Sequence, residues 1–352
     1  MAKSVTVSAP GKAHLIGEHA VVGGEPAIIG AVGRRLYLTV STSKDVRYAD
    51  ERFGSDRTWP LDDVRNTTKE AYSLWSECAH SKPINFGPLG SRLKANQFED
   101  YLKAAIGQTL RAYAPEGETG GVTVRILNKG GLPSGSGLGS SSALAVSLAK
   151  AVADVYGKTP TTEELNSLAF SIETLMHGTP SGGDNTASTY GGLIWFRKAT
   201  PTNEIKSLRG EVPYSLENFA LVYTGKPEKT TLELVQLVRE KPEFERRVRF
   251  RAIGEGTTLM LEALKRRDYD GVRRIMGFAQ ENLAALGVST PAIDALVESV
   301  KKVGGAAKLV GAGGGGMVLA QADDKGALLR KIRDAGYEPL DADFGVEGVR
   351  LE

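Results

Sequence analysis

The chain has 352 residues, of which 41% are hydrophobic and 24% are charged, a balance typical of a globular protein with a substantial buried core. At this length about two domains, or one large α/β unit, are expected. The formal net charge of only +2 argues against a dedicated nucleic-acid-binding or membrane-surface protein, because such proteins carry a clear basic excess.

Cysteine usage and hydropathy narrow the class of protein further. Cys78 is the single cysteine, so an intrachain disulfide is impossible, which fits a reducing, cytoplasmic location. We expect no membrane contact, since no apolar run approaches the roughly 18 residues of a membrane span. The N-terminus lacks the apolar core of a signal peptide, so we expect none.

The N-terminal third is predicted to hold two strands separated by glycine-containing loops. Alternating apolar residues indicate strands over 4–8 and 36–40. Between them, "APGKAHLIGEHAVVGGEP" has the composition of a loop, and Lys12 is predicted to lie in a Gly/Pro turn. The polar stretch 45–94 is predicted to be an irregular excursion with one or two short helices.

The middle third alternates between helices, a strand and glycine-rich segments. Helical spacing indicates a helix over 97–113, and alternation indicates a strand over 121–127. "GLPSGSGLGSSSALA" (131–145) comes next and leads into a helix predicted to be buried on most sides. Thr161 and Glu164 form a capping-box signature for a helix that ends near His177.

The remaining elements are predicted from the same patterns. A turn-rich segment, "HGTPSGGDNTASTYGG", precedes a strand over 193–196. The later elements are strands at 219–223, 307–310, 317–320 and 338–341, and helices at about 227–239, 242–267, 269–286 and 291–303, with one more from Asp324. Strands and helices interleave irregularly without a repeat, which indicates an α+β protein with domains over 1–205 and 206–352.

The stretch 131–145 has the composition of a phosphate-binding loop but fits neither common motif. It lacks the Gly-Lys-Ser/Thr of a Walker A loop, and its glycines miss the i, i+2, i+5 spacing of a dinucleotide fingerprint. Gly135, Gly137 and Gly139 nevertheless permit close backbone approach, and the following helix N-terminus favours an anion. A flexible loop with a serine cap is the ordinary alternative.

The segment 311–316 does satisfy G-x-G-x-x-G, yet a nucleotide-binding βαβ unit is rejected there. The motif has meaning only between a strand and a helix, and here the strand-like "MVLA" follows. We therefore predict a tight glycine connection between two antiparallel strands.

Several isolated polar residues have ordinary explanations when each is taken alone. Lys12 could be a surface lysine, Asp184 an Asx cap, and Glu173 a solvent-facing helical glutamate. Metal-ligand clusters and a G-x-S-x-G elbow are absent from the sequence, and the basic run 246–251 lacks interleaved aromatic residues. Together, however, a phosphate cradle, a cation and carboxylates form the set that phosphoryl transfer requires.

Three segments in order resemble the three motifs of the GHMP kinases: "APGKAHLIGEHAVVGG", "LPSGSGLGSSSA" and "KLVGAGGGG". The resemblance spans nearly the whole chain, and "GEHAVV" is most similar to the mevalonate kinase branch. It implies the GHMP kinase fold, with a left-handed βαβ unit in the N-terminal domain and a ferredoxin-like C-terminal domain. It also implies ATP-dependent phosphorylation of mevalonate at its C5 hydroxyl to 5-phosphomevalonate, in isoprenoid precursor biosynthesis.

The resemblance also implies roles for individual residues. Lys12 and Asp184 would be catalytic, and Ser141 and Glu173 would hold Mg²⁺. The mevalonate pocket would include Glu18, His19, Thr224 and Ala312. The ATP phosphates would lie against Pro133, Ser134, Gly135, Ser136, Gly137, Leu138, Gly139, Ser140 and Ser141.

The third motif departs from the family pattern, because Val310 and Met317 stand where a threonine and a cysteine are usual. This departure concerns substrate details and leaves the kinase class intact. Two alternatives stay open: another GHMP kinase acting on phosphomevalonate or a sugar, and a catalytically silent nucleotide or metabolite sensor. A homodimer is common among relatives and is expected here, with no nucleic-acid partner.

Overall fold

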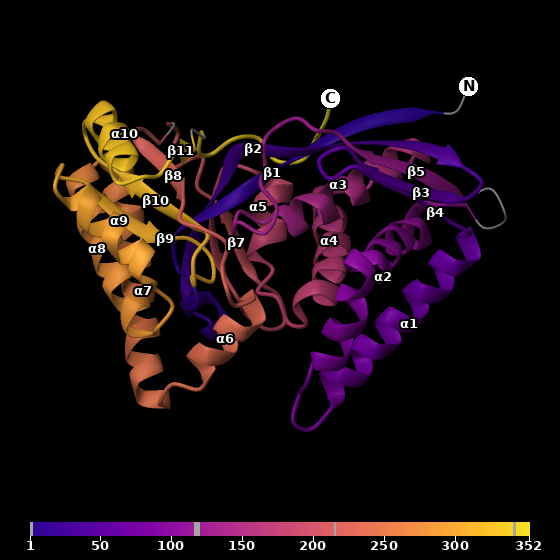
Figure 1. Cartoon of the computed structure of the whole chain (residues 1–352), viewed down its shortest axis with the longest axis horizontal. Coiled ribbons are helices and arrows are strands. Elements are labelled where there is room, and N and C mark those ends of the chain that lie inside the picture. Colours follow the sequence, from indigo (N-terminus) through magenta and orange to yellow (C-terminus); the bar gives the residue numbers. More distant parts are fainter. Residues whose placement is uncertain (1–2, 116–119, 215, 341–342) are drawn as a thin grey trace.

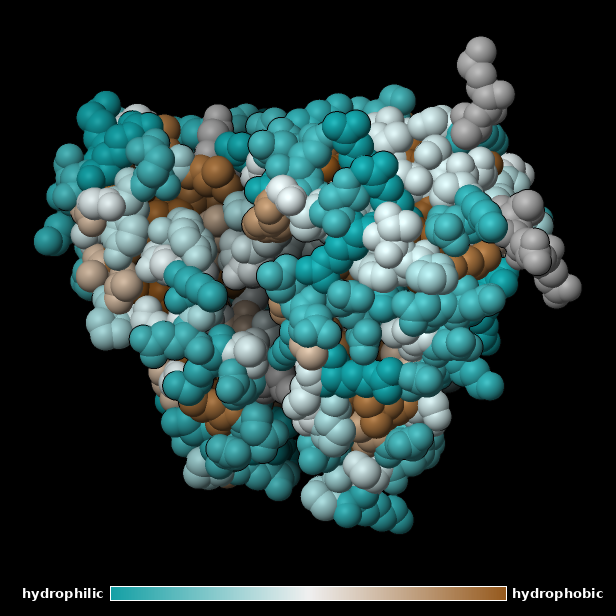
Figure 2. All heavy atoms as spheres, turned by 45° about the vertical axis from the view of Figure 1, so that its right-hand side comes forward, coloured by the Kyte–Doolittle hydropathy of each residue, from teal (hydrophilic) through white to brown (hydrophobic). Residues whose placement is uncertain are grey.

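The computed structural model describes residues 3–115, 120–214, 216–340 and 343–352. Within these ranges the strands form two sheets, one of eight strands and one of four. Figure 1 shows the smaller sheet and its helices on one side of the molecule, and the long helices α1 and α2 on the other. In Figure 2 these two parts project in the same direction with a notch between them, and the visible surface is mostly hydrophilic.

The larger sheet is built around two long antiparallel strands, β1 (Ser4–Ile16) and β2 (Pro26–Ser43). One end of β2 pairs with β5 and the other with β6, so this single strand connects both halves of the sheet. The path β12-β1-β2-β5-β3-β4 is extended by β6 and β7. The shorter strands are β3 (Val46–Asp50), β4 (Ser55–Trp59), β5 (Gly121–Ile126), β6 (Leu193–Arg197), β7 (Glu204–Ser207) and β12 (Arg350–Leu351).

The predicted extent of the first strand was wrong. Residues 9–16 continue β1 instead of forming a loop, and the short 3-10 helix η1 (Ala20–Gly23) follows. The strand continues through its glycine and proline because β2 pairs with it along its whole length, with register shifts at Pro10/Gly11 and at His14/Ile16. Lys12 therefore lies within a long strand and not in a turn.

Helix α3 (Ser140–Val155) lies against strands β1 and β2 of the larger sheet, and α4 (Thr162–His177) packs against α3. The prediction that α3 is buried on most sides is confirmed, since its alanines let neighbouring backbones approach closely. The capping box is confirmed as well. The Glu164 N–H donates to Thr161 Oγ1 over 3.2 Å, and the Thr161 N–H donates to the Glu164 carboxylate over 2.7 Å.

The stretch 45–94 is more regular than its composition indicated, and the prediction of one or two short helices was wrong. It contains the β3–β4 hairpin, the 20-residue helix α1 (Leu61–His80) and the start of α2 (Gly87–Tyr113). The buried positions of α1 include Thr67, Thr68 and Cys78 besides larger apolar residues. These small and polar buried residues lower the mean hydropathy of the stretch, so its composition resembled that of a loop.

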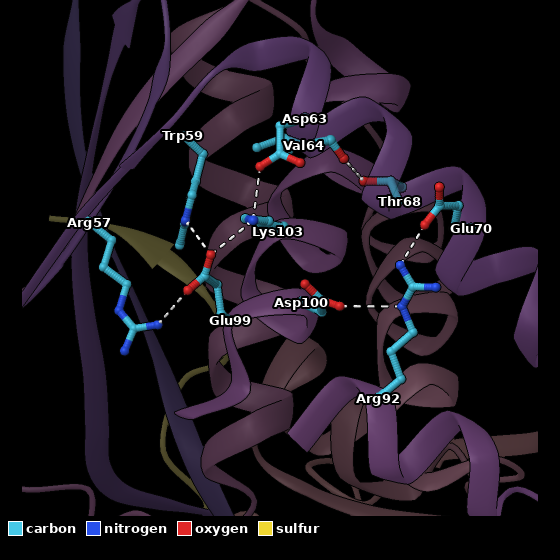
Figure 3. Close-up of polar contacts among 10 residues, drawn as sticks. All are labelled: Arg57, Trp59, Asp63, Val64, Thr68, Glu70, Arg92, Glu99, Asp100 and Lys103. Carbon is cyan, nitrogen blue, oxygen red and sulfur yellow. Dashed lines mark hydrogen bonds and ion pairs between the residues drawn. The ribbon is translucent and has the colours of Figure 1, made fainter. Parts of the chain in front are cut away.

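Helix α2 is interrupted where residues 96–98 adopt positive φ angles of 47–63°. Charged side chains surround this break (Figure 3). Arg57 donates to the Glu99 carboxylate over 3.1 Å, and Lys103 contacts Glu99 and Asp63, each over 2.9 Å. The interactions join β4, α1 and α2, which explains how a strained backbone is held in place.

The smaller sheet has the strand order β11-β8-β10-β9, and all its pairs are antiparallel. Its chain order of strand, helices, two strands, helix and strand is that of a ferredoxin-like unit. Its strands are β8 (Phe219–Tyr223), β9 (Ala306–Leu309), β10 (Met317–Gln321) and β11 (Pro339–Leu340). Its helices are α6 (Thr231–Arg239), α7 (Glu243–Lys265), α8 (Tyr269–Ala285), α9 (Pro291–Lys301) and α10 (Lys325–Asp334).

The strands and helices of the second half follow in the predicted order. The exceptions are the end of the last predicted strand and two strands that were not predicted. Residue 341 of the predicted last strand lies outside the described residues. Strands β7 and β12 were missed, and β12 pairs with β1, so the end of the chain returns to the larger sheet. The division into 1–205 and 206–352 stays a prediction. Among the described residues no helix combines the length and apolarity needed to cross a membrane.

Candidate active site

Lys12 and Asp184 form an ion pair, with 3.0 Å between Nζ and Oδ2. Lys12 comes from the middle of β1, and Asp184 from the first turn of helix α5 (Gly183–Tyr190). This helix occupies part of the segment predicted to be turn-rich, so the prediction of a turn around Asp184 was wrong. Lys12 is 3% exposed and Asp184 is 37% exposed, so the carboxylate is the member of the pair that an incoming molecule meets first.

The charge of Asp184 is stabilised by its partner. Burial by itself would raise the pKa of the carboxyl group, but the attraction of Lys12 outweighs it, and the pKa lies below its ordinary value. Asp184 is therefore ionised at neutral pH. An ionised carboxylate can accept a proton or a hydrogen bond from a bound hydroxyl group.

The glycine-rich segment 133–141 lies directly against Lys12. The Lys12 ammonium donates to the Gly137 carbonyl over 3.1 Å, and the Lys12 N–H donates to the Leu138 carbonyl over 2.9 Å. Gly135, Gly137 and Gly139 have φ angles of 68°, 88° and 70°, a region that glycine adopts without strain. The lysine and the segment thus form one structural unit.

Helix α3 begins at Ser140, directly after this segment. Gly139 is its N-cap residue, and no side chain caps the first turn. The first backbone N–H groups of a helix lack intrahelical acceptors, and they carry the positive end of the helix dipole. The geometry therefore offers anion-binding groups beside the Lys12 ammonium.

Glu173 of α4 is buried beside the start of α3. Its Oε2 accepts hydrogen bonds from the Ser142 hydroxyl and, over 3.3 Å, from the Ser141 hydroxyl, and His177 Nε2 lies 3.7 Å away. Burial raises the pKa of Glu173, opposed by His177 and the serine hydroxyls, while Asp184 raises it further. Glu173 and Asp184 are therefore close enough for their charges to interact.

The donor set around Glu173 fits Mg²⁺. Glu173 Oε1 is buried and has no hydrogen-bond partner among the described residues, and the Ser141 hydroxyl is adjacent. Carboxylate and hydroxyl oxygens are the hard ligands that Mg²⁺ prefers, usually completed by substrate phosphates and water. In the described part of the chain no group of three His, Cys, Asp or Glu side chains could hold a metal by itself.

The second glycine-rich segment, 311–316, connects the antiparallel strands β9 and β10, as predicted. It lies against the first one, because the Met317 N–H donates to the Ser136 carbonyl over 3.1 Å. A Cβ added at Gly316 would lie 3.0 Å from the same carbonyl oxygen. Glycine is therefore required here by close packing between the two segments, and the two sheets meet at this point.

The residues predicted to bind substrate lie near this junction, and several already have partners in the protein. The Thr224 hydroxyl donates to the Gly316 carbonyl over 3.0 Å. His19 Nε2 lies 2.8 Å from the Ala312 carbonyl oxygen, and His19 has a φ of 57°, which is unusual for a residue other than glycine. Glu18 is paired with Lys308.

Sequence reasoning missed two residues of the site, Lys308 and His14. Lys308 is fully buried on β9 and contacts Glu18 and the His14 carbonyl oxygen. His14 lies two positions after Lys12 on β1 and is 5% exposed. The signals in the sequence were a lysine directly before the third glycine-rich motif and a histidine at alternate spacing from Lys12, and neither is specific by itself.

Comparisons with known proteins agree with this geometry. Residues 100–192 match the model for the GHMP kinases N terminal domain, and residues 260–338 match that for the GHMP kinases C terminal. Mevalonate kinase of Thermococcus gammatolerans is 31% identical over 99% of this chain and 98% of its own length. The chain belongs to the GHMP kinase family.

Further relatives support the same assignment. Mevalonate kinase of Aeropyrum pernix is 29% identical to this GHMP kinase over 100% of this chain and 99% of its own. The crystal structure of the Methanococcus jannaschii mevalonate kinase superposes with a TM-score of 0.78 at 26% identity, covering 98% of this chain and 99% of that one. The GHMP kinase fold expected from the sequence is therefore confirmed, and so is the enzyme class.

Proposed function

We propose that this GHMP kinase transfers the γ-phosphoryl group of ATP to the C5 hydroxyl of mevalonate, giving 5-phosphomevalonate for isoprenoid precursor biosynthesis. The observation that carries the proposal is the position of the Lys12 ammonium, between the Asp184 carboxylate and the Gly137 carbonyl of the glycine-rich segment. A phosphoryl donor and a hydroxyl acceptor would meet at that point. The full-length similarity to mevalonate kinases supports the choice of acceptor.

The ATP phosphates would bind to segment 133–141 and the N-terminus of α3. The backbone N–H groups of Ser140 and Ser141 lie at the uncapped first turn of this helix. Phosphoryl transfer depends mainly on positioning and on neutralising the charge of the transferred group. Backbone donors and the Lys12 ammonium supply both, since they are fixed before the substrates arrive.

Asp184 would receive the acceptor hydroxyl. Its carboxylate is ionised, partly exposed and held by Lys12, so it can orient the hydroxyl and accept its proton as the new P–O bond forms. Lys12 would at the same time stabilise the negative charge on the attacking oxygen and on the γ-phosphoryl oxygens. Asp184 thereby acts on the proton of the attacking hydroxyl, and Lys12 acts on the negative charge around the forming P–O bond.

Ser141 and Glu173 would hold Mg²⁺ through the serine hydroxyl and the unpartnered Oε1. The ion supplies charge neutralisation for the ATP phosphates when it is bound. Glu173 is kept ready for this role by the Ser142 hydroxyl, which holds the other carboxylate oxygen in place.

The mevalonate pocket would be formed by the junction of the two sheets, with His19, Ala312, Thr224 and Glu18 around it. The His19 contact with the Ala312 carbonyl fixes one wall of the pocket, and the Thr224 contact with Gly316 fixes another. A homodimer, the two-domain division and a cytoplasmic location are parts of the same proposal. The single, buried Cys78 agrees with that location.

A coupled ADP-release assay over mevalonate, phosphomevalonate, homoserine and galactose tests the proposal. The expected result is turnover that depends on mevalonate and Mg²⁺, with 5-phosphomevalonate as product. Preference for one of the other alcohols would overturn the acceptor but keep the kinase mechanism. ATP binding without ADP release for any acceptor would favour a catalytically silent sensor.

A further inference from the structure

Buried polar atoms without partners gather around the Lys12–Asp184 pair. They are both ring nitrogens of His14, Oε2 of Glu18 and Oε1 of Glu173, each lacking a hydrogen-bond partner among the described residues. Buried polar groups are normally paired, because an unpaired one loses its hydration without compensation. Unpaired polar atoms that cluster at one site indicate a bound ligand that forms hydrogen bonds with them. The proposed Mg²⁺ ion would pair only with Glu173, so the other atoms require a different partner.

His14 is the member of this cluster for which the proposed mechanism provides no role. It follows Lys12 by two positions on β1, and the β1–β2 register is regular between them, so both side chains lie on the same face of the sheet. The charges of Lys12, Asp184 and Lys308 all act on its ring. Its carbonyl oxygen accepts a hydrogen bond from Lys308 over 3.4 Å, which holds the backbone there in position.

The imidazole of His14 is neutral at physiological pH. Burial, and then the charge of Lys12, lowers its pKa to about 3. A neutral imidazole has one N–H donor and one nitrogen acceptor. This pair of groups matches a hydroxyl, which also donates and accepts, better than it matches a carboxylate, which only accepts.

We propose that His14 is a specificity-determining residue that hydrogen-bonds a second hydroxyl of the acceptor while Asp184 engages the attacking hydroxyl. His14 lies two positions, about 7 Å along the strand, from Lys12. The Lys12 ammonium contacts Asp184 over 3.0 Å, so a small hydroxy acid bound at Asp184 can extend toward His14. In mevalonate, the acceptor under the proposed function, the second hydroxyl is the one on C3. The inference rests on that function for the identity of the hydroxyl.

The Asp184 side chain is the partly exposed group of the site, and the His14 ring lies deeper, with its nitrogens almost without exposed surface. Binding therefore requires a small side-chain rearrangement of the kind common when ligands enter preformed sites. The substrate hydroxyl then displaces no hydrogen bond of the protein, because both ring nitrogens of His14 are unpartnered.

The test compares wild type with His14→Leu and His14→Gln, using mevalonate and its analogue without the C3 hydroxyl, 5-hydroxy-3-methylpentanoate. For His14→Leu we expect the KM for mevalonate to rise about ten-fold, as for the loss of one desolvated hydrogen bond, with the KM for ATP unchanged. His14→Gln keeps a donor and an acceptor and should recover part of the loss. With the analogue, wild type and His14→Leu should differ less than two-fold, because the hydroxyl that reports on the imidazole is missing.

The thermal midpoint separates this role from a structural one. An apolar residue of similar size relieves an unpaired buried group, so His14→Leu should melt at the same or a higher temperature than wild type. Ser147→Ala is the matched control, since Ser147 Oγ is also buried and unpartnered but lies further along α3. It should leave both KM values unchanged.

Two outcomes would overturn the inference: an unchanged KM for mevalonate in His14→Leu, or an equal effect of this substitution on mevalonate and on its analogue. The first would mean that an ordered water, or nothing, completes the imidazole. Failure of the proposed function is distinguishable, because wild type itself would then give no mevalonate-dependent ADP release. The same variants would in that case be compared on the preferred alcohol and its deoxy analogue.

Discussion

Lys308 and Glu18 form an ion pair that is fully buried between the two sheets. Lys308 lies on β9 of the smaller sheet, and Glu18 follows β1 of the larger one. The lysine also donates to the carbonyls of Leu309 and His14, so its ammonium is surrounded by oxygen atoms from both sheets. This pair therefore joins the two parts of the molecule directly beside the site.

Removing one partner of the pair should be costly. Lys308→Met leaves the Glu18 carboxylate buried without a counter-charge, and we expect a loss of about 3–5 kcal/mol in the free energy of unfolding. The double variant Glu18→Gln/Lys308→Met removes both charges and should recover much of that loss. Urea unfolding measures both quantities, and equal stability of the single and double variants would contradict the assigned coupling.

Asp184→Asn should reduce kcat by about 10²–10⁴-fold, the usual contribution of a positioned general base. The amide cannot accept the hydroxyl proton, although it has nearly the same shape. The Kd for ATP, measured by calorimetry, should stay within a few-fold of wild type, because the nucleotide contacts segment 133–141 instead. Near-normal turnover in this variant would remove Asp184 from the mechanism.

Gly139→Ala tests the contact between the glycine-rich segment and Lys12. The new Cβ would lie 3.0 Å from Lys12 Cγ, so the lysine has to shift, and a misplacement of this kind can reduce kcat on the order of 10²-fold. Gly157→Ala is the matched control. Gly157 has nearly the same φ, 69° against 70°, but open space around it, so it shares the backbone strain without the contact.

In this comparison both variants should lose similar stability in urea unfolding, while only Gly139→Ala should lose turnover. An equal loss of turnover in the two variants would show that backbone strain alone affects activity.

Glu173→Gln should stabilise the metal-free protein and inactivate the enzyme. Burial raises the pKa of Glu173, so the folded protein is more stable when this carboxyl group is protonated. The free energy of unfolding then decreases as the pH rises through the raised pKa and the group ionises. A neutral glutamine avoids the loss, and the thermal midpoint at pH 7 should increase. Activity should fall at least ten-fold at all Mg²⁺ concentrations, and a decreased midpoint with retained activity would contradict both roles.

The stability of the ligand-free protein should depend on pH through His14. The unfolded chain binds a proton at this residue near pH 6.5, whereas the folded protein does so only near pH 3. Between these values the unfolded state holds the additional proton, so this contribution to stability is lost as the pH falls. The His14→Leu variant should show a weaker decrease between pH 6.5 and 5, by up to about 1.4 kcal/mol per pH unit. Urea unfolding across this range measures the difference, and identical pH profiles would contradict the buried, neutral imidazole.

Local signals in the sequence were sufficient for many elements. The Thr161 capping box and the small residues of α3 each act within one or two helical turns, so they could be identified without tertiary structure. The three glycine-rich motifs were also identifiable in order. Their order identified the family, since each of them alone has an ordinary explanation.

Local patterns were therefore enough to identify the helices with strong caps, the glycine-rich segment before α3 and the kinase family. The three-dimensional structure was needed to establish that β1 continues through Lys12, that Asp184 lies on a helix, and that Lys308 is buried against Glu18. The reason is physical: caps and turns depend on neighbours within a few residues, whereas strand extension and burial depend on partners far away in the chain. Glu18 and Lys308 are 290 residues apart, and no local pattern brings them together.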